Sequence, residues 1–106
     1  MNRNAPLQVT VEIRFESGPT AGQRRFRLSH SLGLPPEIQF HHPLPLEGEG
    51  SGQVRFTLPE GTSITALATL YFDPEHPERG SHAELLDVSK TDLAAIETYI
   101  DQRLET

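Results

Sequence analysis

The sequence predicts a mainly β domain, either a small antiparallel barrel or a rolled sheet, followed by one C-terminal α-helix. Two observations support this fold class. Five or six short segments are predicted to be strands, and most of them alternate apolar and polar residues with a period of two, which is typical of strands with one buried face. One segment with helical periodicity follows them, and the strand–helix–strand alternation that builds a parallel sheet does not occur.

The clearest strand pair lies in the second half of the chain. Residues 53–58 alternate polar and apolar side chains, and the Pro59-Glu60-Gly61 sequence then allows the chain to reverse. Residues 64–72 carry apolar side chains on both parities, which predicts a strand that is covered on both faces. We expect the other elements to pack on this hairpin.

Two more strands are predicted near the N-terminus. Residues 7–16 alternate strictly and predict a strand with one solvent-facing side. Residues 23–28 predict a second strand, which pairs with the first across a turn at 17–22. Residues 1–6 are expected to be flexible, as chain ends usually are.

For the strand at 23–28, the sequence must also indicate which side chains face the core and which face solvent. Its side chains alternate between arginine and apolar residues. We expect Phe26 and Leu28 to point into the core, and Arg25 and Arg27 to point into solvent.

The remaining segments are less regular. Gly33 and two prolines predict irregular structure over residues 29–36, before a short strand at 37–41. A proline- and glycine-rich stretch at 42–52 predicts either a mobile loop or a strained connection at a sheet edge. A polar loop at 73–80 then leads to a last strand at 81–88.

The C-terminal helix is predicted over residues 89–105. Ser89 and Asp92 have the spacing of a capping box, in which a hydroxyl caps the first turn. Apolar residues then recur at steps of three and four, which gives the helix one apolar stripe. This stripe consists of Leu93, Ile96, Ile100 and Leu104.

Length and composition limit the function classes. A chain of 106 residues predicts one domain, spanning residues 1–106. The absence of cysteine excludes disulfides, thiolate zinc sites and thiol catalysis. We expect a cytoplasmic protein without membrane insertion, because no apolar run has the length of a signal peptide or a membrane helix. The net charge of −6 opposes bulk binding to nucleic acid.

Two runs of the chain resemble the PilZ domain, a bacterial barrel associated with cyclic di-GMP signalling. QVRFTLPEGTSITALAT is similar to the family's strand, Leu-Pro-x-Gly turn and strand, and ELLDVSKTDLAAIETYIDQRLE to its last strand and closing helix. Weaker similarity extends back through LSHSLGL. The resemblance implies a closed six-stranded antiparallel barrel with a C-terminal helix.

The two nucleotide-binding motifs of that family are not kept. At the RxxxR motif, Arg3 is present but Leu7 occupies the second arginine position. At the (D/N)xSxxG motif, aligning Ser29 places Arg27 in the acidic position and Leu32 in the glycine position. Aligning Gly33 instead places Leu28 in the acidic position and His30 in the serine position. Each lost charged hydrogen bond removes about 1.5 to 3 kcal/mol of binding energy.

The resemblance therefore implies a divergent member without cyclic di-GMP binding. Its implied function is that of a non-catalytic regulatory or adaptor module, which binds proteins of a bacterial signalling, pilus or motility system. The alternative is a cyclic di-GMP receptor that uses a displaced arginine cluster. Such a cluster could bind the ligand because its two phosphates require paired cationic side chains. The candidate residues for that site are Arg3, Arg24, Arg25, Arg27 and Ser29.

The same arginines have two other interpretations. They are equally typical of a solvated strand face, where exposed charge is the rule. Together with Phe26 they also allow a nucleic-acid-binding barrel, which the negative net charge disfavours.

A partner-binding surface is predicted from leucines in proline-bounded segments. If they lie together on the surface, they mark a partner site; if they close the barrel, they are core. The exposed helix face is a second candidate. These leucines are Leu32, Leu34, Leu44 and Leu46. Acidic residues that steer a basic partner, or simply confer solubility, are Glu47, Glu49, Asp73, Glu75 and Glu78.

Neither a catalytic centre nor a metal site is predicted. The five histidines have no recognised metal-ligand spacing, and His41 and His42 are expected on opposite faces of a strand. Ser29, His30 and Ser31 are chain neighbours without the G-x-S-x-G context of a hydrolase nucleophile. No cofactor is predicted, and cyclic di-GMP is the ligand only of the alternative function.

Overall fold

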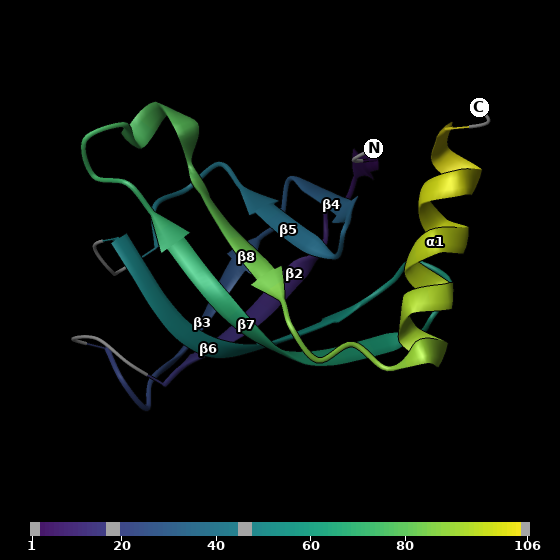
Figure 1. Cartoon of the computed structure of the whole chain (residues 1–106), viewed down its shortest axis with the longest axis horizontal. Coiled ribbons are helices and arrows are strands. Elements are labelled where there is room, and N and C mark those ends of the chain that lie inside the picture. Colours follow the sequence, from purple (N-terminus) through teal and green to yellow (C-terminus); the bar gives the residue numbers. More distant parts are fainter. Residues whose placement is uncertain (1–2, 17–19, 45–47, 105–106) are drawn as a thin grey trace.

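The computed structural model describes residues 3–16, 20–44 and 48–104. These residues form an eight-stranded antiparallel sheet that curls into a half-barrel, with one helix beside it (Figure 1). The strand order is β1-β4-β5-β8-β7-β6-β2-β3. The elements are β1 (Arg3–Pro6), β2 (Thr10–Phe15), β3 (Arg24–Leu28), β4 (Ser31–Leu34), β5 (Glu37–Phe40), β6 (Gly48–Thr57), β7 (Ser63–Phe72), the 3₁₀ turn η1 (Pro77–Arg79), β8 (Ser81–Leu85) and α1 (Lys90–Leu104).

The mainly β class with a C-terminal helix is confirmed, but the closed six-stranded barrel is wrong. The sheet has eight strands because two long segments of the chain, 3–15 and 24–34, are each interrupted and therefore form two strands. Pro6 lies opposite Ser31, whereas Thr10 lies opposite Leu28, so residues 7–9 face only residues 29–30. This extra residue is a β-bulge, which bends the paired strands and divides them into β1 with β4 and β2 with β3.

The bulge is held by Ser29. Its buried hydroxyl lies 2.7 Å from the Leu7 carbonyl oxygen and 2.9 Å from that of Val9, and accepts a hydrogen bond from the Val9 amide at 3.2 Å. Two backbone bonds flank it, from the Leu7 amide to the His30 carbonyl and from the Ser29 amide to the Val9 carbonyl. Ser29 therefore satisfies backbone groups that the bulge leaves out of the ladder.

Replacing Ser29 by alanine is expected to lower the free energy of unfolding by about 1 to 3 kcal/mol, because buried backbone groups lose their partner. Ser63→Ala is the matched control, since the Ser63 hydroxyl bonds that of Thr57 on an exposed surface and its loss changes stability by about 0.5 kcal/mol or less. Urea unfolding of the two variants measures the difference. Equal effects would show that Ser29 does not hold the bulge.

Several predicted loops are strands. Residues 3–6, expected to be flexible, form β1, and Ala5 within it is buried. Residues 31–34, expected to be irregular, form β4. Gly33 suits that strand because a Cβ atom there would lie 3.2 Å from the Arg3 carbonyl oxygen of β1. Glycine was interpreted as a breaker but permits close strand approach.

The central hairpin is confirmed, with two differences. β6 begins at Gly48 and so includes part of the predicted 42–52 loop. β7 alternates buried and exposed residues, so the prediction that it is covered on both faces is wrong. The turn between β6 and β7 is at the predicted place, with the Gly61 amide bonded to the Leu58 carbonyl.

The core lies on the inner face of the curled sheet and under α1. Alternate residues of β2, β6 and β7 supply nine of its 21 buried hydrophobic residues in the described ranges, as the period of two predicts. The largest fully buried side chains are Phe15, Phe56, Leu7, Ile13, Leu32, Ile38, Leu58, Ile64, Leu70, Ile96, Ile100 and Val11.

Helix α1 docks on the β1 and β4 side of the sheet. The predicted cap is confirmed, with the Asp92 amide donating to the Ser89 hydroxyl at 3.1 Å. Ile96 and Ile100 of the predicted stripe are fully buried. The Tyr99 hydroxyl donates to the Pro6 carbonyl, and Arg3 pairs with Asp101, so both bonds hold α1 to β1.

Candidate binding surface

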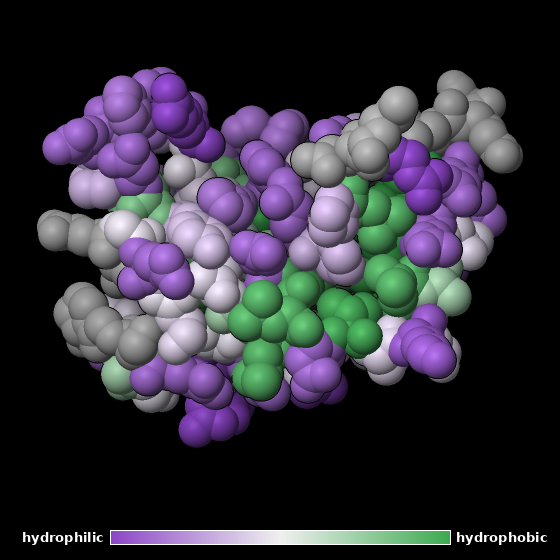
Figure 2. Space-filling model, viewed as in Figure 1, coloured by the Kyte–Doolittle hydropathy of each residue, from purple (hydrophilic) through white to green (hydrophobic). Residues whose placement is uncertain are grey.

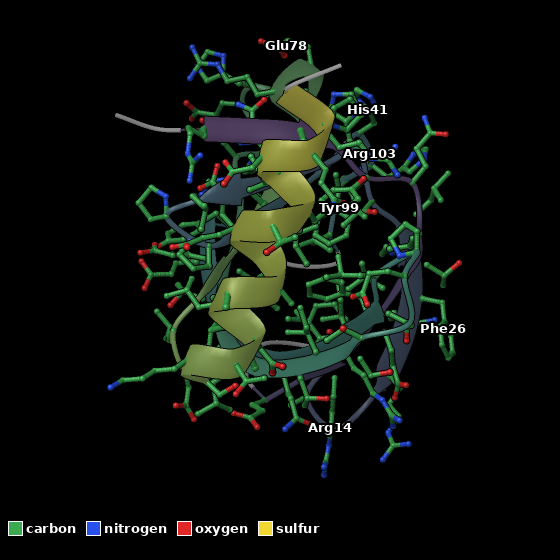
Figure 3. All side chains as sticks on the ribbon, turned by 90° about the vertical axis from the view of Figure 1, so that its right-hand side faces the viewer. Arg14, Phe26, His41, Glu78, Tyr99 and Arg103 are labelled. Carbon is green, nitrogen blue, oxygen red and sulfur yellow. The ribbon has the colours of Figure 1, made fainter. Side chains whose placement is uncertain are left out.

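The side chains of β3 face the opposite way from the prediction. Phe26 lies opposite Glu12, and Leu28 opposite Thr10, so both share the outer face of the sheet with the polar side of β2. They are 65% and 54% exposed. Figure 3 shows Phe26 projecting outward at the edge of the molecule. The prediction that these two residues point into the core is therefore wrong.

Arg25 and Arg27 lie on the inner face, opposite Ile13 and Val11. Arg25 donates to the Gln23 side chain at 2.8 Å, and neither arginine forms an ion pair within the described ranges. The Nε atom of Arg27 is buried without a hydrogen-bond partner among the described residues. Among the described residues, therefore, no carboxylate pairs with either guanidinium group.

The outer face of β2, β3 and β6 carries three more arginines. Arg24 lies 3.6 Å from Glu12, in a pair between partly exposed groups. Arg14 and Arg55 have no carboxylate partner in the part of the chain that the structure describes. Phe26 lines a hollow of about 330 Å³ on this face together with Arg55. We call this surface the arginine face; it consists of Arg14, Arg24, Phe26, Leu28 and Arg55.

The hydrogen-bond ladder of β3 is one-sided. β3 is the last strand in the sheet order, so no described strand lies along its second edge. At the two ends of its ladder with β2, the Phe15 amide donates to the Gln23 carbonyl, and the Ser29 amide donates to the Val9 carbonyl. Hydrogen-bonded and non-bonded pairs alternate in an antiparallel ladder, so the odd-numbered residues of β3 bond to β2.

The even-numbered residues of β3 consequently direct their backbone away from the sheet. These are Arg24, Phe26 and Leu28, and no backbone partner for them occurs among the described residues outside the β2 ladder. Three amide and carbonyl pairs thus line one edge. We call this row the free edge of β3.

The predicted nucleotide-site residues are not brought together. Arg3 lies in β1 and pairs with Asp101 of α1, while Ser29 is buried in the bulge. Arg24 lies on the outer face, and Arg25 and Arg27 on the inner face. Only the three β3 arginines are neighbours, and they point to two sides of the sheet.

The predicted leucine patch is also not present as a surface. Leu32 and Leu44 are buried in the core, Leu34 is half-buried against it, and Leu46 lies outside the described residues. Leu32 and Leu44 are therefore core residues and not part of an exposed patch, although the sheet that they pack on is not a closed barrel. Figure 2 shows that other hydrophobic side chains reach the surface, in a band that runs toward α1.

One pair of exposed leucines was missed. Leu67 of β7 is 43% exposed and Leu86 is 61% exposed, and the Leu86 amide donates to the Leu67 carbonyl at 2.8 Å. The sequence signal for Leu67 is the presence of apolar residues on both parities of 64–72, a pattern that also predicts burial on two faces.

A hollow of about 490 Å³ lies where β7 ends and β8 begins. The rings of Tyr71 and His82 stack there, with centroids 4.6 Å apart. Partial desolvation, and then the charges of Glu49 and Glu84, raise the pKa of the Tyr71 hydroxyl. Glu49 and Asp73 of the predicted acidic set line this hollow together with Arg79.

The histidines do not form a metal centre in the described ranges. The rings of His30 and His41 touch, with centroids 3.8 Å apart, and His76 lies 3.4 Å from Glu78. No group of three or more histidine, aspartate or glutamate side chains there has a geometry that could hold a metal ion.

Comparisons of the chain with protein-family models, curated proteins and solved structures gave no match. No helix in the described part of the chain combines the length and hydrophobicity needed to cross a bilayer.

Proposed function

We propose that this chain is a non-catalytic adaptor or regulatory module of PilZ type. It acts in the cytoplasm through protein–protein contacts, in a bacterial signalling, pilus or motility system. The observation that carries the proposal is the exposure of Phe26 and Leu28 beside Arg25 and Arg27, which have no carboxylate partner among the described residues. Aromatic and arginine side chains are enriched in the energetic centres of protein interfaces.

The resemblance of the second half of the chain to PilZ domains supports the biological setting. A curled β-sheet followed by a C-terminal helix agrees with the coarse architecture that the resemblance implies. The departures at both nucleotide motifs favour an adaptor over a receptor.

A capture experiment tests the proposal. The wild-type domain is used to capture proteins from a bacterial extract, and the captured protein is purified and rebound directly. We expect a direct complex that Phe26→Ser with Leu28→Ser abolishes. Leu86→Ser, at an equally exposed leucine, is expected to leave it intact. If the Phe26→Ser, Leu28→Ser variant binds the partner as well as the wild-type domain does, the proposal is contradicted.

The alternative is a cyclic di-GMP receptor. The observation in its favour is that Arg14, Arg25, Arg27 and Arg55 have no ion-pair partner among the described residues, so paired cationic groups are free to bind phosphate. Calorimetric titration with cyclic di-GMP is expected to show no binding. Binding that Arg24→Ala or Arg25→Ala abolishes would replace the adaptor with the receptor.

A further inference from the structure

We propose that β3 accepts an extended, acidic segment of a partner protein as an additional strand of the sheet. The inference rests on the proposed adaptor function and names the mode of binding and the chemistry of the partner. Strand addition needs an unpaired edge, side chains that select the incoming sequence, and a barrier to self-association. β3 has all three.

The edge is the free edge of β3. The backbone groups of Arg24, Phe26 and Leu28 point away from β2. Alternate residues on one side of a strand are about 7 Å apart. An incoming strand of five residues therefore spans all three amide and carbonyl pairs. Arg24, Arg25, Phe26 and Leu28 are exposed and Arg27 is half-buried, so the outer face of the strand is open and the inner face is covered only in part.

The side chains of β3 select an alternating sequence. Side chains opposite each other on paired strands share a face. Positions of the incoming strand on the outer face meet Phe26 and Leu28, which favour apolar residues. Positions on the inner face meet Arg25 and Arg27, which lack ion-pair partners in the described ranges and favour glutamate or aspartate.

The charge pattern excludes a second copy of this chain as the occupant. Pairing two β3 strands would place up to six arginines in adjacent strands, and like charges on paired strands repel. The arginines thus block edge-to-edge self-association and leave the edge open to a strand of opposite charge. A nucleic acid would use the arginine face and would not need the free edge.

A synthetic peptide tests strand addition. The probe alternates valine with glutamate over seven residues, carries a fluorescent label, and is compared with a peptide in which lysine replaces glutamate. We expect the glutamate peptide alone to raise the fluorescence anisotropy on titration with the domain. A double variant, Arg25→Glu with Arg27→Glu, is expected to reverse this preference and bind the lysine peptide. Binding of both peptides, or of neither, would overturn the inference.

A matched pair of variants isolates the backbone. Arg24→Pro removes one amide of the free edge, which an edge strand tolerates because that amide does not bond β2. Arg24→Ala removes the same side chain and keeps the amide. We expect Arg24→Pro to weaken peptide binding about five- to tenfold more than Arg24→Ala, the effect of one lost hydrogen bond. Equal weakening would show that the backbone takes no part.

Amide hydrogen exchange in the wild-type domain gives an independent result. Addition of the glutamate peptide is expected to protect the amides of Arg24, Phe26 and Leu28, and to change those of Arg25 and Arg27 little, since these already bond β2. Unprotected even-numbered amides would contradict strand addition even if the proline variant failed to fold. Preferential binding of single-stranded RNA in place of the peptide would assign the arginine face to nucleic acid.

The outcomes separate the two proposals. A captured partner that needs Phe26 and Leu28 but tolerates Arg24→Pro as well as Arg24→Ala keeps the adaptor and rejects strand addition. If no partner that depends on Phe26 and Leu28 is captured, the adaptor function itself is rejected.

Discussion

Replacing Gly80 by alanine is expected to destabilise the fold by about 3 kcal/mol or more, which is a large effect for a single methyl group. Gly80 has a φ of +69°, in the region that favours glycine. A Cβ atom there would lie 2.1 Å from the carbonyl oxygen of Phe40. Because the obstacle is backbone at the junction of β5 and β8, it cannot move aside as a flexible side chain would.

The neighbouring contacts oppose relaxation at this junction. The Ser81 hydroxyl donates to the His42 carbonyl at 2.6 Å, and the Gly80 amide donates to that of Pro77 at 3.1 Å. Moving β8 away from Phe40 would disturb both bonds and the β5–β8 ladder. We therefore expect Gly80→Ala either to unfold at much lower urea concentration or to be recovered largely insoluble.

Gly61→Ala provides the matched control. Gly61 also has a positive φ, of +112°, but no atom lies within 4 Å of a Cβ built there. This variant is expected to lose about 1 kcal/mol, from backbone conformation alone. Urea unfolding compares the two, and a similar loss in both variants would contradict the close approach of β8 to Phe40.

The sequence correctly predicts the elements in which the spacing of apolar residues allows only one buried face. β2, β6 and α1 each have apolar residues at the spacing of one buried face, and the structure confirms all three. The Ser89 cap was predictable because capping depends on residues within one turn. These features are local, so no partner strand is needed to assign them.

β3 could not be assigned in this way. Its five residues alternate arginine with phenylalanine and leucine, and the pattern itself does not say which set points inward. The register decides, and a slip of one residue would exchange the two faces. Here the turn fixes the register through the Phe15 amide bond to the Gln23 carbonyl. Because β3 is the last strand of the sheet and contacts little of the core, it tolerates arginines on its inner face.

The candidate binding surface depends on the same choice. The side of the sheet on which Phe26 lies follows from this register, whereas the free edge also depends on β3 being the last strand in the sheet order. The leucine patch failed for a different reason. Leu32 and Leu44 lie in segments whose burial depends on strands far along the chain, and proline content gives no information about that burial.

The same substitution at two phenylalanines tests the register directly. Phe56→Ala is expected to lower the free energy of unfolding by about 3 to 5 kcal/mol, because the ring is 2% exposed in the core and its loss leaves a cavity. Phe26→Ala is expected to lower it by about 0.5 kcal/mol or less, since that ring is mostly in solvent. The chemical deletion is identical, so the difference reports burial alone.

Urea unfolding measures both variants, and partner capture measures the second. If the predicted inward register were correct, Phe26→Ala would cost about as much stability as Phe56→Ala. We expect instead that Phe26→Ala folds normally and captures less partner. An exposed aromatic ring that contributes to binding and not to stability is the property that distinguishes an interaction surface from a core.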